Sequence, residues 1–529
     1  MESKKILLLL PVMAGLVLAS CGGGSTASSS SSSKSESASS SSNSKLSSSS
    51  TATSSASSSS STAGSSSSSS SSNQHKDTGV ITEPTSISFW NNSSYGDQID
   101  NIIEAFKAIE PNVTVTNVKQ TGSYTDIKDM VVQGIPADNY PDMFLGYPDS
   151  VCEIMNYNKV VKLDDYIDSP VYGWTADEKA DVIDNYLAEG QAYPVEGTWS
   201  LPMAKSTEAM FYNSDILIGL NLSAQDSTIN GGAALTADYL NNLTWEEMFG
   251  KLCPAITAYN ATLATDAKIL KDDQAYHGII SYDSDDNLFI TLAEQYGYGY
   301  TSVDTTTGKG SLDFNNSNMK GLMKTFNAAA KNGYFLTKGY AGGNYTNTYF
   351  TARNLLFSIG STGGTKYQLP EKNKFNVGVA RVPHAAGKDA KVINQGPSVC
   401  ILDHKDSNRA LATWLFYKFF TNEKNNTAWS INTTYMPVRY SVYSSDDYLA
   451  ACVETEKDPL SLELLQAKVN SYDSTVNDDL FLSSVFKGSS DARTQVGALT
   501  TRCLQQTTLT DAWLDEAFKT AIDNIKLKM

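Results

Sequence analysis

Aromatic and amide side chains gather where the first predicted strand ends. Trp90 ends the alternating segment 85–90, Asn91 and Asn92 follow it directly, and Tyr95 lies further along the same loop. A sugar presents C–H faces and a belt of hydroxyls, so a sugar site needs flat aromatic surfaces with amides or carboxylates beside them. The same pattern also fits a core tryptophan followed by turn-forming asparagines, and both interpretations stay open.

Two more loops follow predicted strands and should lie beside the first. Tyr124 comes after the strand predicted at 113–118, and Tyr147 and Asp149 come after the strand predicted at 141–146. Ligands of parallel sheets bind beyond the carboxyl ends of the strands, where these loops meet. Asp149 could bind a ligand, or it could cap the helix that we expect from Ser150 onward.

A run of small residues in the second half of the chain is a further candidate. Ser361, Thr362 and Gly363 follow an apolar strand and lie within Gly-Ser-Thr-Gly-Gly at 360–364. Small side chains let the backbone approach a ligand, and amides at the start of a following helix favour an anion such as a sugar phosphate. A tight strand-to-helix turn without a ligand is the alternative.

Motifs for other chemistries are weak or missing in the sequence. The four histidines are scattered, and there is neither a Gly-x-Ser-x-Gly elbow nor a P-loop, so we expect no cofactor and no metal. Residues 283–294 have the acidic offsets of a calcium loop, but Leu288 occupies the position that requires glycine, and a capped helix is the better interpretation. Because Asp and Glu are numerous, a spatial carboxylate pair typical of a glycosidase remains an alternative.

The elements that must position these residues alternate between strands and helices. Apolar periodicity predicts strands at 85–90, 113–118 and 141–146, helices at 98–109 and 124–134, and a short extended piece at 160–163. This order predicts an α/β fold with a mostly parallel sheet. Later helices are expected at 410–420 and 513–525, capping boxes at Thr175–Glu178 and Thr244–Glu247, and strands at 375–382 and 398–402. Strands so far apart in the sequence imply that the chain crosses between two lobes more than once.

The first 79 residues differ from the rest of the chain. Residues 1–20 have a basic start and a short apolar run, which predicts a secretory signal, and the sequence up to Cys21 resembles a bacterial lipobox. The resemblance implies that Cys21 carries a lipid, followed by a serine-rich linker at 21–79 that we expect to be disordered. We therefore expect the protein at the extracellular face of the cell membrane, held there by the lipid alone.

Composition and charge limit the function of the remaining 450 residues. That length exceeds one core and predicts two lobes. The formal net charge is −17, which argues against nucleic acid as a partner. Of the five other cysteines, Cys452 and Cys503 could form a disulfide, or all five could be buried free thiols.

Several motifs over residues 85–525 resemble the extracellular solute-binding proteins of family 1, the carbohydrate-binding subunits of ATP-driven importers. Asn242 stands where the family usually has a proline-rich stretch, and the last motif lacks its glycine. The motifs are the opening strand 87–90, Phe106 to Pro111 with Val113-Thr-Val115, Gly134 with Pro141-Asp142, Leu201-Pro202 through Phe211-Tyr212-Asn213, Leu243-Thr-Trp-Glu-Glu247, Phe357 to Gly364, and Tyr435-Met-Pro437.

This resemblance implies a two-lobed fold of the periplasmic-binding-protein type II, with a ligand cleft between lobes joined by crossing strands. We expect one lobe from 80–205 with about 374–425, and the other from 206–373 with about 426–529. The implied function is capture of a mono- or oligosaccharide by hinge closure and delivery to ABC permease subunits with a cytoplasmic ATPase, without catalysis. A sugar-phosphate or glycerol-phosphate ligand is the alternative, and a surface glycosidase is a more remote one. We expect a monomer.

The resemblance also points to individual residues. Maltose-binding members have a carboxylate at the position of Asp149 and a stacking tryptophan where Gly146 stands, so Tyr147 could replace that ring. They have another carboxylate near the first crossing segment, where Ser206 stands in this sequence and Glu208 could serve with a shift. Hinge structure without ligand contact is the alternative for both residues.

Overall fold

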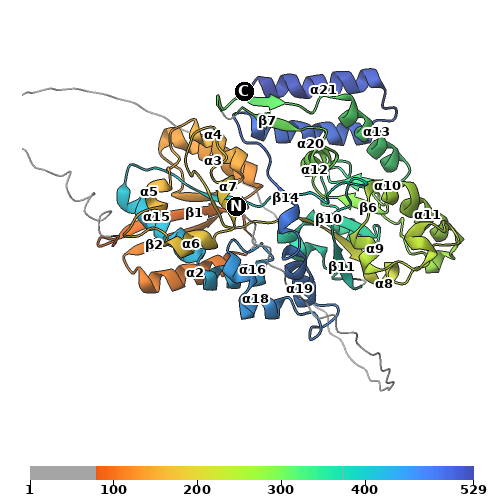
Figure 1. Ribbon diagram of the computed structural model, residues 1–529, viewed down its shortest axis with the longest axis horizontal. Coiled ribbons are helices and arrows are strands. Elements are labelled where there is room, and N and C mark those ends of the chain that lie inside the picture. Colours follow the sequence, from red (N-terminus) through yellow and green to blue (C-terminus); the bar gives the residue numbers. More distant parts are fainter. Residues whose placement is uncertain (1–78, 94, 305, 373) are drawn as a thin grey trace, which may run out of the picture. The chain divides into compact units, whose positions relative to one another are not determined.

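The computed structural model describes residues 79–529 except residues 94, 305 and 373. The predicted signal peptide, the lipid on Cys21 and the serine-rich linker up to residue 78 therefore lie outside the described residues. Two five-stranded sheets, each covered by helices, form the architecture (Figure 1). No helix among the described residues is both long and apolar enough to cross a membrane.

The first sheet has the strand order β2-β1-β3-β13-β4. Its strands β1 (Thr85–Asn91), β2 (Val113–Lys119) and β3 (Met143–Gly146) run parallel, while β13 (Ser398–Ile401) lies antiparallel to β3 and to β4 (Leu201–Pro202). The register runs from Thr85 opposite Val113 to Asn91 opposite Lys119. The predicted β-α-β-α-β order is confirmed, and the parallel strands bring the loops after β1 and β3 to one edge of the sheet.

Amphipathic helices cover this sheet. Helix α2 (Gly96–Ile109) buries Ile99, Ile102, Ile103 and Phe106, which share one helical face. The ring of Phe106 packs at 5.3 Å from that of Phe416 on α15 (Ser407–Phe420). Helix α3 (Tyr124–Gly134) begins with a capping box of Ser123 and Asp126, and α4 (Pro148–Met155) begins directly after β3.

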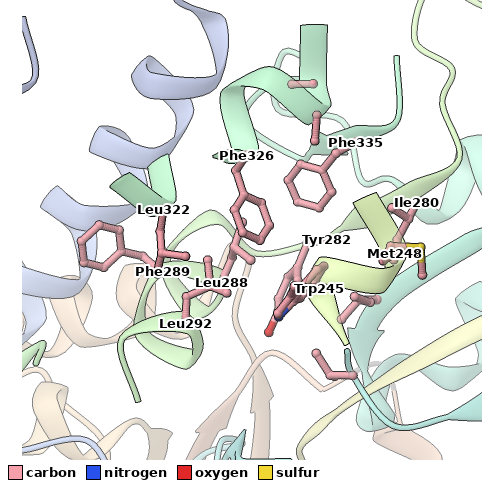
Figure 2. Packing of buried hydrophobic residues seen from close by; sticks show 14 of the residues in the cluster. Trp245, Met248, Ile280, Tyr282, Leu288, Phe289, Leu292, Leu322, Phe326 and Phe335 are labelled. Atoms are coloured by element: carbon pink, nitrogen blue, oxygen red, sulfur yellow. The ribbon is translucent and has the colours of Figure 1, made fainter. Parts of the chain in front are cut away.

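The second sheet has the order β11-β5-β10-β6-β9. Strands β6 (Ile280–Tyr282), β9 (Phe335–Thr337) and β10 (Phe357–Ser361) are parallel, and β5 (Glu208–Asn213) pairs antiparallel with β10 and with β11 (Val377–Ala380). Its core is rich in aromatic rings, among them Trp245, Phe326 and Phe335, which are labelled in Figure 2. The ring centres of Trp245 and Phe326 lie 5.1 Å apart.

One expected lobe boundary is corrected by this pairing. We expected residues from about 374 onward in the first lobe, but Val377–Ala380 pairs with β5 in the second sheet. The chain joins the first sheet only at β13, after the crossing residues 394–397. The reason is that β10 occupies only one edge of β5, so the strand that follows β10 pairs with the other edge before the chain crosses.

Three crossing segments lie side by side between the sheets. Lys205 pairs with Met436 and Ser206 with Gln395 through isolated backbone bridges. The buried Lys205 ammonium makes an ion pair of 2.7 Å with Glu189 and donates to the Gly396 carbonyl oxygen. This network fixes the connection through which both sheets are joined.

The remaining elements fill the space around the two sheets. Three of the predicted features are confirmed among them: the capping box at Thr175 and Glu178, the helix over 285–296 in place of a calcium loop, and the C-terminal helix. At Thr244 the predicted capping box is incomplete: the Thr244 side chain accepts from the Glu247 amide, but the return bond from the Thr244 amide to the Glu247 side chain is not formed. The elements are η1 (Ile135–Ala137), α5 (Asp164–Ile167), α6 (Ala176–Asp181), α7 (Asp184–Glu189), α8 (Ser214–Leu217), η2 (Ile229–Gly232), α9 (Ala237–Asn241), α10 (Trp245–Glu247), the π-helix η3 (Met248–Leu252), α11 (Cys253–Thr262), η4 (Thr265–Ala267), α12 (Asp285–Tyr296), β7 (Thr301–Val303), β8 (Gly310–Leu312), α13 (Ser317–Lys331), α14 (Asn347–Thr351), η5 (Thr362–Gln368), β12 (Val392–Ile393), α16 (Glu423–Thr433), α17 (Tyr440–Tyr443), α18 (Asp446–Ala451), α19 (Leu462–Asp473), η6 (Asn477–Asp479), β14 (Leu480–Phe481), α20 (Ser489–Gln505) and α21 (Asp511–Lys526).

All five cysteines in the described residues are free. The alternative of a disulfide between Cys452 and Cys503 is therefore wrong. Cys503 is buried in the core of the second sheet, while Cys452 packs against a separate cluster around Tyr186 and Tyr443, so their side chains belong to different cores.

Candidate ligand-binding site

A pocket lies where the loop after β3 faces the C-terminal segment and one crossing segment. It encloses about 500 Å³ of empty space, a volume that includes its open mouth. Its lining comes from distant parts of the sequence: Tyr147, Pro148, Asp149, Glu189, Tyr300, Asn394, Gln395, Gly396, Ser483, Ser484, Val485, Ser489 and Arg493. The pocket therefore forms only after both sheets and their crossings are in place.

Two tyrosines supply the aromatic surface of the pocket. Tyr147 precedes α4 and packs edge-to-face on Tyr124, with ring centres 5.3 Å apart. Tyr300 precedes β7 and stacks near Phe314, with ring centres 6.2 Å apart. Burial raises the pKa of both phenols well above the ordinary value, so both keep their protons and can donate hydrogen bonds.

Arg493 on α20 carries the positive charge of the pocket. Its Nη1 donates to Asp286 Oδ2 at 3.1 Å and to Asn287 Oδ1 at 2.6 Å, and its Nε lies 3.4 Å from Asp149 Oδ2. The pKa of Arg493 is raised by these carboxylates against the opposing effect of burial. The ion pair with Asp149 joins α20 to α4, and so links elements of the two lobes.

Several polar atoms of the pocket wall are buried without a hydrogen-bond partner in the described part of the chain. They are Asn394 Oδ1, Ser483 Oγ and Arg493 Nε. A buried polar atom without a partner costs roughly 1–3 kcal/mol. Arg493 Nε nevertheless faces Asp149 Oδ2 at 3.4 Å, so an acceptor and a hydroxyl of two lining residues are left without a partner, which suits a ligand that both donates and accepts.

Glu189 also lines the pocket, but both of its carboxylate oxygens already accept hydrogen bonds from within the protein. Its carboxylate accepts from Lys205 at 2.7 Å, from the Ser398 hydroxyl at 2.9 Å and from the Asn394 amide at 3.2 Å. These partners neutralise and orient the carboxylate. Glu189 therefore fixes Asn394 with its Oδ1 left open.

Of the residues proposed from the sequence, Tyr147 and Asp149 line this pocket. The alternative that Asp149 caps the following helix is wrong, because α4 begins at Pro148, with Tyr147 at its N-cap and no side-chain cap bond. Asp149 Oδ1 accepts from the Ser150 amide at the start of α4, while its Oδ2 faces Arg493. Whether either residue contacts a ligand stays a prediction.

The other predicted residues lie outside the pocket lining. Asn91 and Asn92 are used by the fold, since their amides donate to Asn117 and to the Gly122 carbonyl oxygen. Trp90 packs into a core cluster beside Tyr124, whose hydroxyl lies 3.2 Å from that of Tyr435. These contacts match the structural alternative for the loop after β1.

Tyr95 and the small residues of the second lobe meet each other. The Tyr95 hydroxyl donates to the Gly363 carbonyl oxygen at 3.5 Å, and the Lys366 ammonium lies 4.3 Å from the centre of the Tyr95 ring. Thr362 is fully buried and accepts from the Thr207 amide, and Ser361 donates to the Ser206 hydroxyl at 3.3 Å. This group connects the lobes beside the pocket.

Glu208 lies behind the pocket and makes no part of its lining. It accepts from the Asn287 amide at 2.9 Å and from the Tyr282 hydroxyl. Burial is the main cause that raises the pKa of Glu208, to about 7.

Most of the second-lobe wall could not be predicted from the sequence. Tyr300 belongs to the alternating tyrosines at 296, 298 and 300, a pattern that offered a weak signal. Arg493, Asn394 and Ser483 carry no local motif, and only the folded chain brings them to Asp149.

A second, larger hollow of about 990 Å³ lies against α10, the π-helix η3 and α13. Its walls are mainly apolar, with Trp245, Phe249 and Phe326. Glu246 at its edge already accepts from Tyr296 and from the Ala386 amide. The open polar atoms of the first pocket distinguish it as the candidate site for a polar ligand.

Comparisons with known proteins agree with this architecture. The UgpB protein of Mycobacterium tuberculosis, solved with glycerophosphocholine, is 16% identical with a TM-score of 0.62 over 83% of this chain and 97% of that chain. The GacH receptor of Streptomyces glaucescens, solved with acarbose, is 14% identical with a TM-score of 0.59 over 83% and 99%. MalE of Bdellovibrio bacteriovorus, bound to maltotriose, is 13% identical with a TM-score of 0.57 over 83% and 100%.

These likenesses show the two-lobed α/β fold of binding proteins. No curated protein sequence matches the chain. The family model of bacterial extracellular solute-binding proteins matches residues 101–453, which is most of the folded chain. The chain therefore belongs to the bacterial extracellular solute-binding proteins.

Proposed function

We propose that this protein captures a carbohydrate outside the cell and delivers it to the permease of an ATP-driven importer, without catalysing a reaction. The proposed binding site is the pocket between Tyr147 and Tyr300. The observation that carries the proposal is the pair of polar atoms without a partner on Asn394 and Ser483, which line the pocket together with these two rings. Each sugar hydroxyl both donates and accepts, so a polyol can satisfy both atoms while its C–H face packs on a ring.

The relatives support a sugar as the ligand class. The GacH receptor and MalE were solved with acarbose and maltotriose. Both are distant in sequence, so they guide only the choice of compounds to test. The side chains of this pocket determine which sugar binds.

A phosphate ester of a polyol is the second candidate, because the Arg493 guanidinium lines the pocket and UgpB was solved with glycerophosphocholine. The charge balance opposes it. Asp149 and Asp286 both lie within 4 Å of the single guanidinium, so the local charge is negative before any ligand enters. A phosphate would have to overcome that repulsion, whereas a neutral sugar would not.

The location and lobe division belong to the same proposal. Lipidation at Cys21 would hold the protein on the outer face of the membrane, and the serine-rich segment would be the linker to the folded part. The protein would be a monomer. The first lobe would comprise residues 80–205 and the segment from β13 to about 433, because Trp429 on α16 packs in the core of the first sheet. The second lobe would comprise the rest of the folded chain, including β11.

Thermal unfolding of the purified full-length protein tests the proposal. The panel contains maltose, maltotriose, acarbose, glycerol 3-phosphate and glycerophosphocholine. A ligand at 100 times its dissociation constant stabilises the folded state by about 2.7 kcal/mol, so at least one sugar should raise the midpoint by several degrees. The two phosphate esters should give smaller shifts than the best sugar.

Matched variants locate the effect. Tyr147→Ala should remove most of the shift, because it deletes an aromatic wall of the pocket. Tyr157→Ala should keep it, since this tyrosine lies just beyond the same helix with 42% of its surface exposed. A flat response to every sugar would contradict the proposal, as would an undiminished shift in Tyr147→Ala. A larger shift with a phosphate ester would favour the second candidate.

A further inference from the structure

A chain of buried hydrogen bonds lies directly behind the pocket. Glu208 begins β5, Asn287 lies on α12 and Gln395 lies in a crossing segment, with 1%, 5% and 9% of their surfaces exposed. Glu208 and Asn287 do not line the pocket, but Gln395 and Arg493 do. Any influence of the first two on a ligand must therefore pass through the other two.

The Asn287 amide connects all of these groups. Its Nδ2 donates to Glu208 Oε1 at 2.9 Å and to Gln395 Oε1 at 2.8 Å, while its Oδ1 accepts from Arg493 Nη1 at 2.6 Å. An amide donates only from nitrogen and accepts only at oxygen. The orientation of Asn287 thus determines how Gln395 and Arg493 are held at the pocket wall.

Glu208 sets that orientation when it is ionised. A carboxylate only accepts, and its two oxygens accept from Asn287 and from the Tyr282 hydroxyl. A protonated Glu208 must donate from one oxygen and can accept only at the other. Either Asn287 turns its oxygen toward Glu208 and releases Arg493, or Tyr282 turns its hydroxyl toward Thr291 and the bond from Asn287 loses its charge assistance.

The charged and titratable groups around Glu208 come from four elements. Tyr282 on β6 and Arg493 on α20 favour the ionised form, and Asp286 on α12 opposes it. Tyr472 on α19 donates to the Glu208 carbonyl oxygen at 2.8 Å. Burial raises the pKa of Glu208 most strongly, and the sum of these effects is a pKa of about 7.

We propose that Glu208 and Asn287 form a proton-sensitive relay that positions Gln395 and Arg493, so that the pocket is ordered for its ligand when Glu208 is ionised. The relay itself is a property of the described side chains. Its effect on affinity rests on the proposed function of the pocket.

Side-chain NMR of the ¹⁵N-labelled full-length protein tests the relay without a ligand. The Asn287 amide and the Arg493 Nε–H resonances should move together between pH 5.5 and 8.5, with a midpoint at about 7. Glu208→Gln should remove this step. Tyr282→Phe should move the midpoint to higher pH, because it removes a donor that stabilises the carboxylate.

A control carboxyl group lies on the same helix as Asn287. Glu294→Gln changes an exposed residue of α12 and should leave both titration curves unchanged. A merely structural role for Glu208 would not move the midpoint in Tyr282→Phe. The relay is overturned if neither resonance shows the step, or if the step persists in Glu208→Gln. Should Glu208→Gln fail to fold, an unmoved midpoint in Tyr282→Phe overturns it.

Binding of maltotriose, or of the panel sugar that stabilises the protein more, tests the consequence. The dissociation constant should rise about fivefold from pH 8 to pH 6, the effect of losing charge assistance in one hydrogen bond. In Glu208→Gln it should not depend on pH. Equal affinity at both pH values would overturn the coupling to the ligand, yet leave the proposed function intact. Absence of binding to every sugar would contradict the proposed function, and the NMR step would still decide the relay.

Discussion

Asp473 ends α19 with both carboxylate oxygens buried and without a hydrogen-bond partner in the described part of the chain. Burial raises the pKa of Asp473 well above its ordinary value. Between the unfolded pKa of about 3.9 and the folded pKa, the folded state binds the extra proton, so stability falls as pH rises through this window. Asp473 therefore destabilises the fold increasingly as the pH rises through this window.

We predict that Asp473→Asn raises the thermal unfolding midpoint at pH 8 and leaves it nearly unchanged or lower at pH 4. The amide keeps the shape of the carboxyl group but does not ionise. Calorimetry at both pH values, with Asp447→Asn on the exposed side of α18 as the control, measures the difference. If Asp473→Asn lowered the unfolding midpoint equally at both pH values, the prediction would be contradicted, because ionisation of Asp473 would then not destabilise the fold.

At the scale of elements, the crossing segments depend on one glycine. Gly396 has φ of 84°, and a Cβ there would lie 2.2 Å from the Ala204 carbonyl oxygen. The Lys205 ammonium donates to the Gly396 carbonyl oxygen at 3.0 Å, so the same residue also holds the buried ion pair. Close approach of two backbones and a left-handed conformation coincide at this position.

Gly396→Ala should lower the free energy of unfolding by about 3 kcal/mol or more, because the backbone of the crossing must shift. Gly219→Ala is a matched control, since Gly219 has the same φ of 84° but no atom within 4 Å of the added carbon. That control should cost only about 1–2 kcal/mol for the left-handed conformation. Urea unfolding measures both, and equal losses would show that the crossing tolerates the methyl group.

Local patterns predict the first sheet because its signals are local. The alternation of β1 and the apolar face of α2 lie within single segments, and Ser123 caps α3 from its own loop. The sheet that β11 joins is decided by a free edge of β5, more than 160 residues earlier in the chain. No periodicity within residues 377–380 carries that information, and so the lobe boundary was misplaced.

The same distinction applies to the site at the scale of the whole molecule. Tyr147 and Asp149 could be proposed because they directly follow a predictable parallel strand. Arg493 reaches Asp149 only after α20 packs on α4 and α12, across more than 300 residues of sequence. The loop after β1 has residue types that suit sugar binding, yet the side-chain amides of Asn91 and Asn92 donate hydrogen bonds within the fold. Residue types in the sequence indicate candidate binding residues, but only the packing of the folded chain determines which of them are free to contact a ligand.

The central claim is that one sugar binds between a tyrosine of the loop after β3 and a tyrosine of the second lobe. Isothermal titration of the full-length protein with the panel sugar that stabilises it most tests this claim directly. We predict one site per chain, with the dissociation constant raised about tenfold or more in Tyr147→Ala and again in Tyr300→Ala, since each loses the burial of an aromatic face. An unchanged dissociation constant in both variants would contradict the account, because the sugar would then bind elsewhere on the molecule.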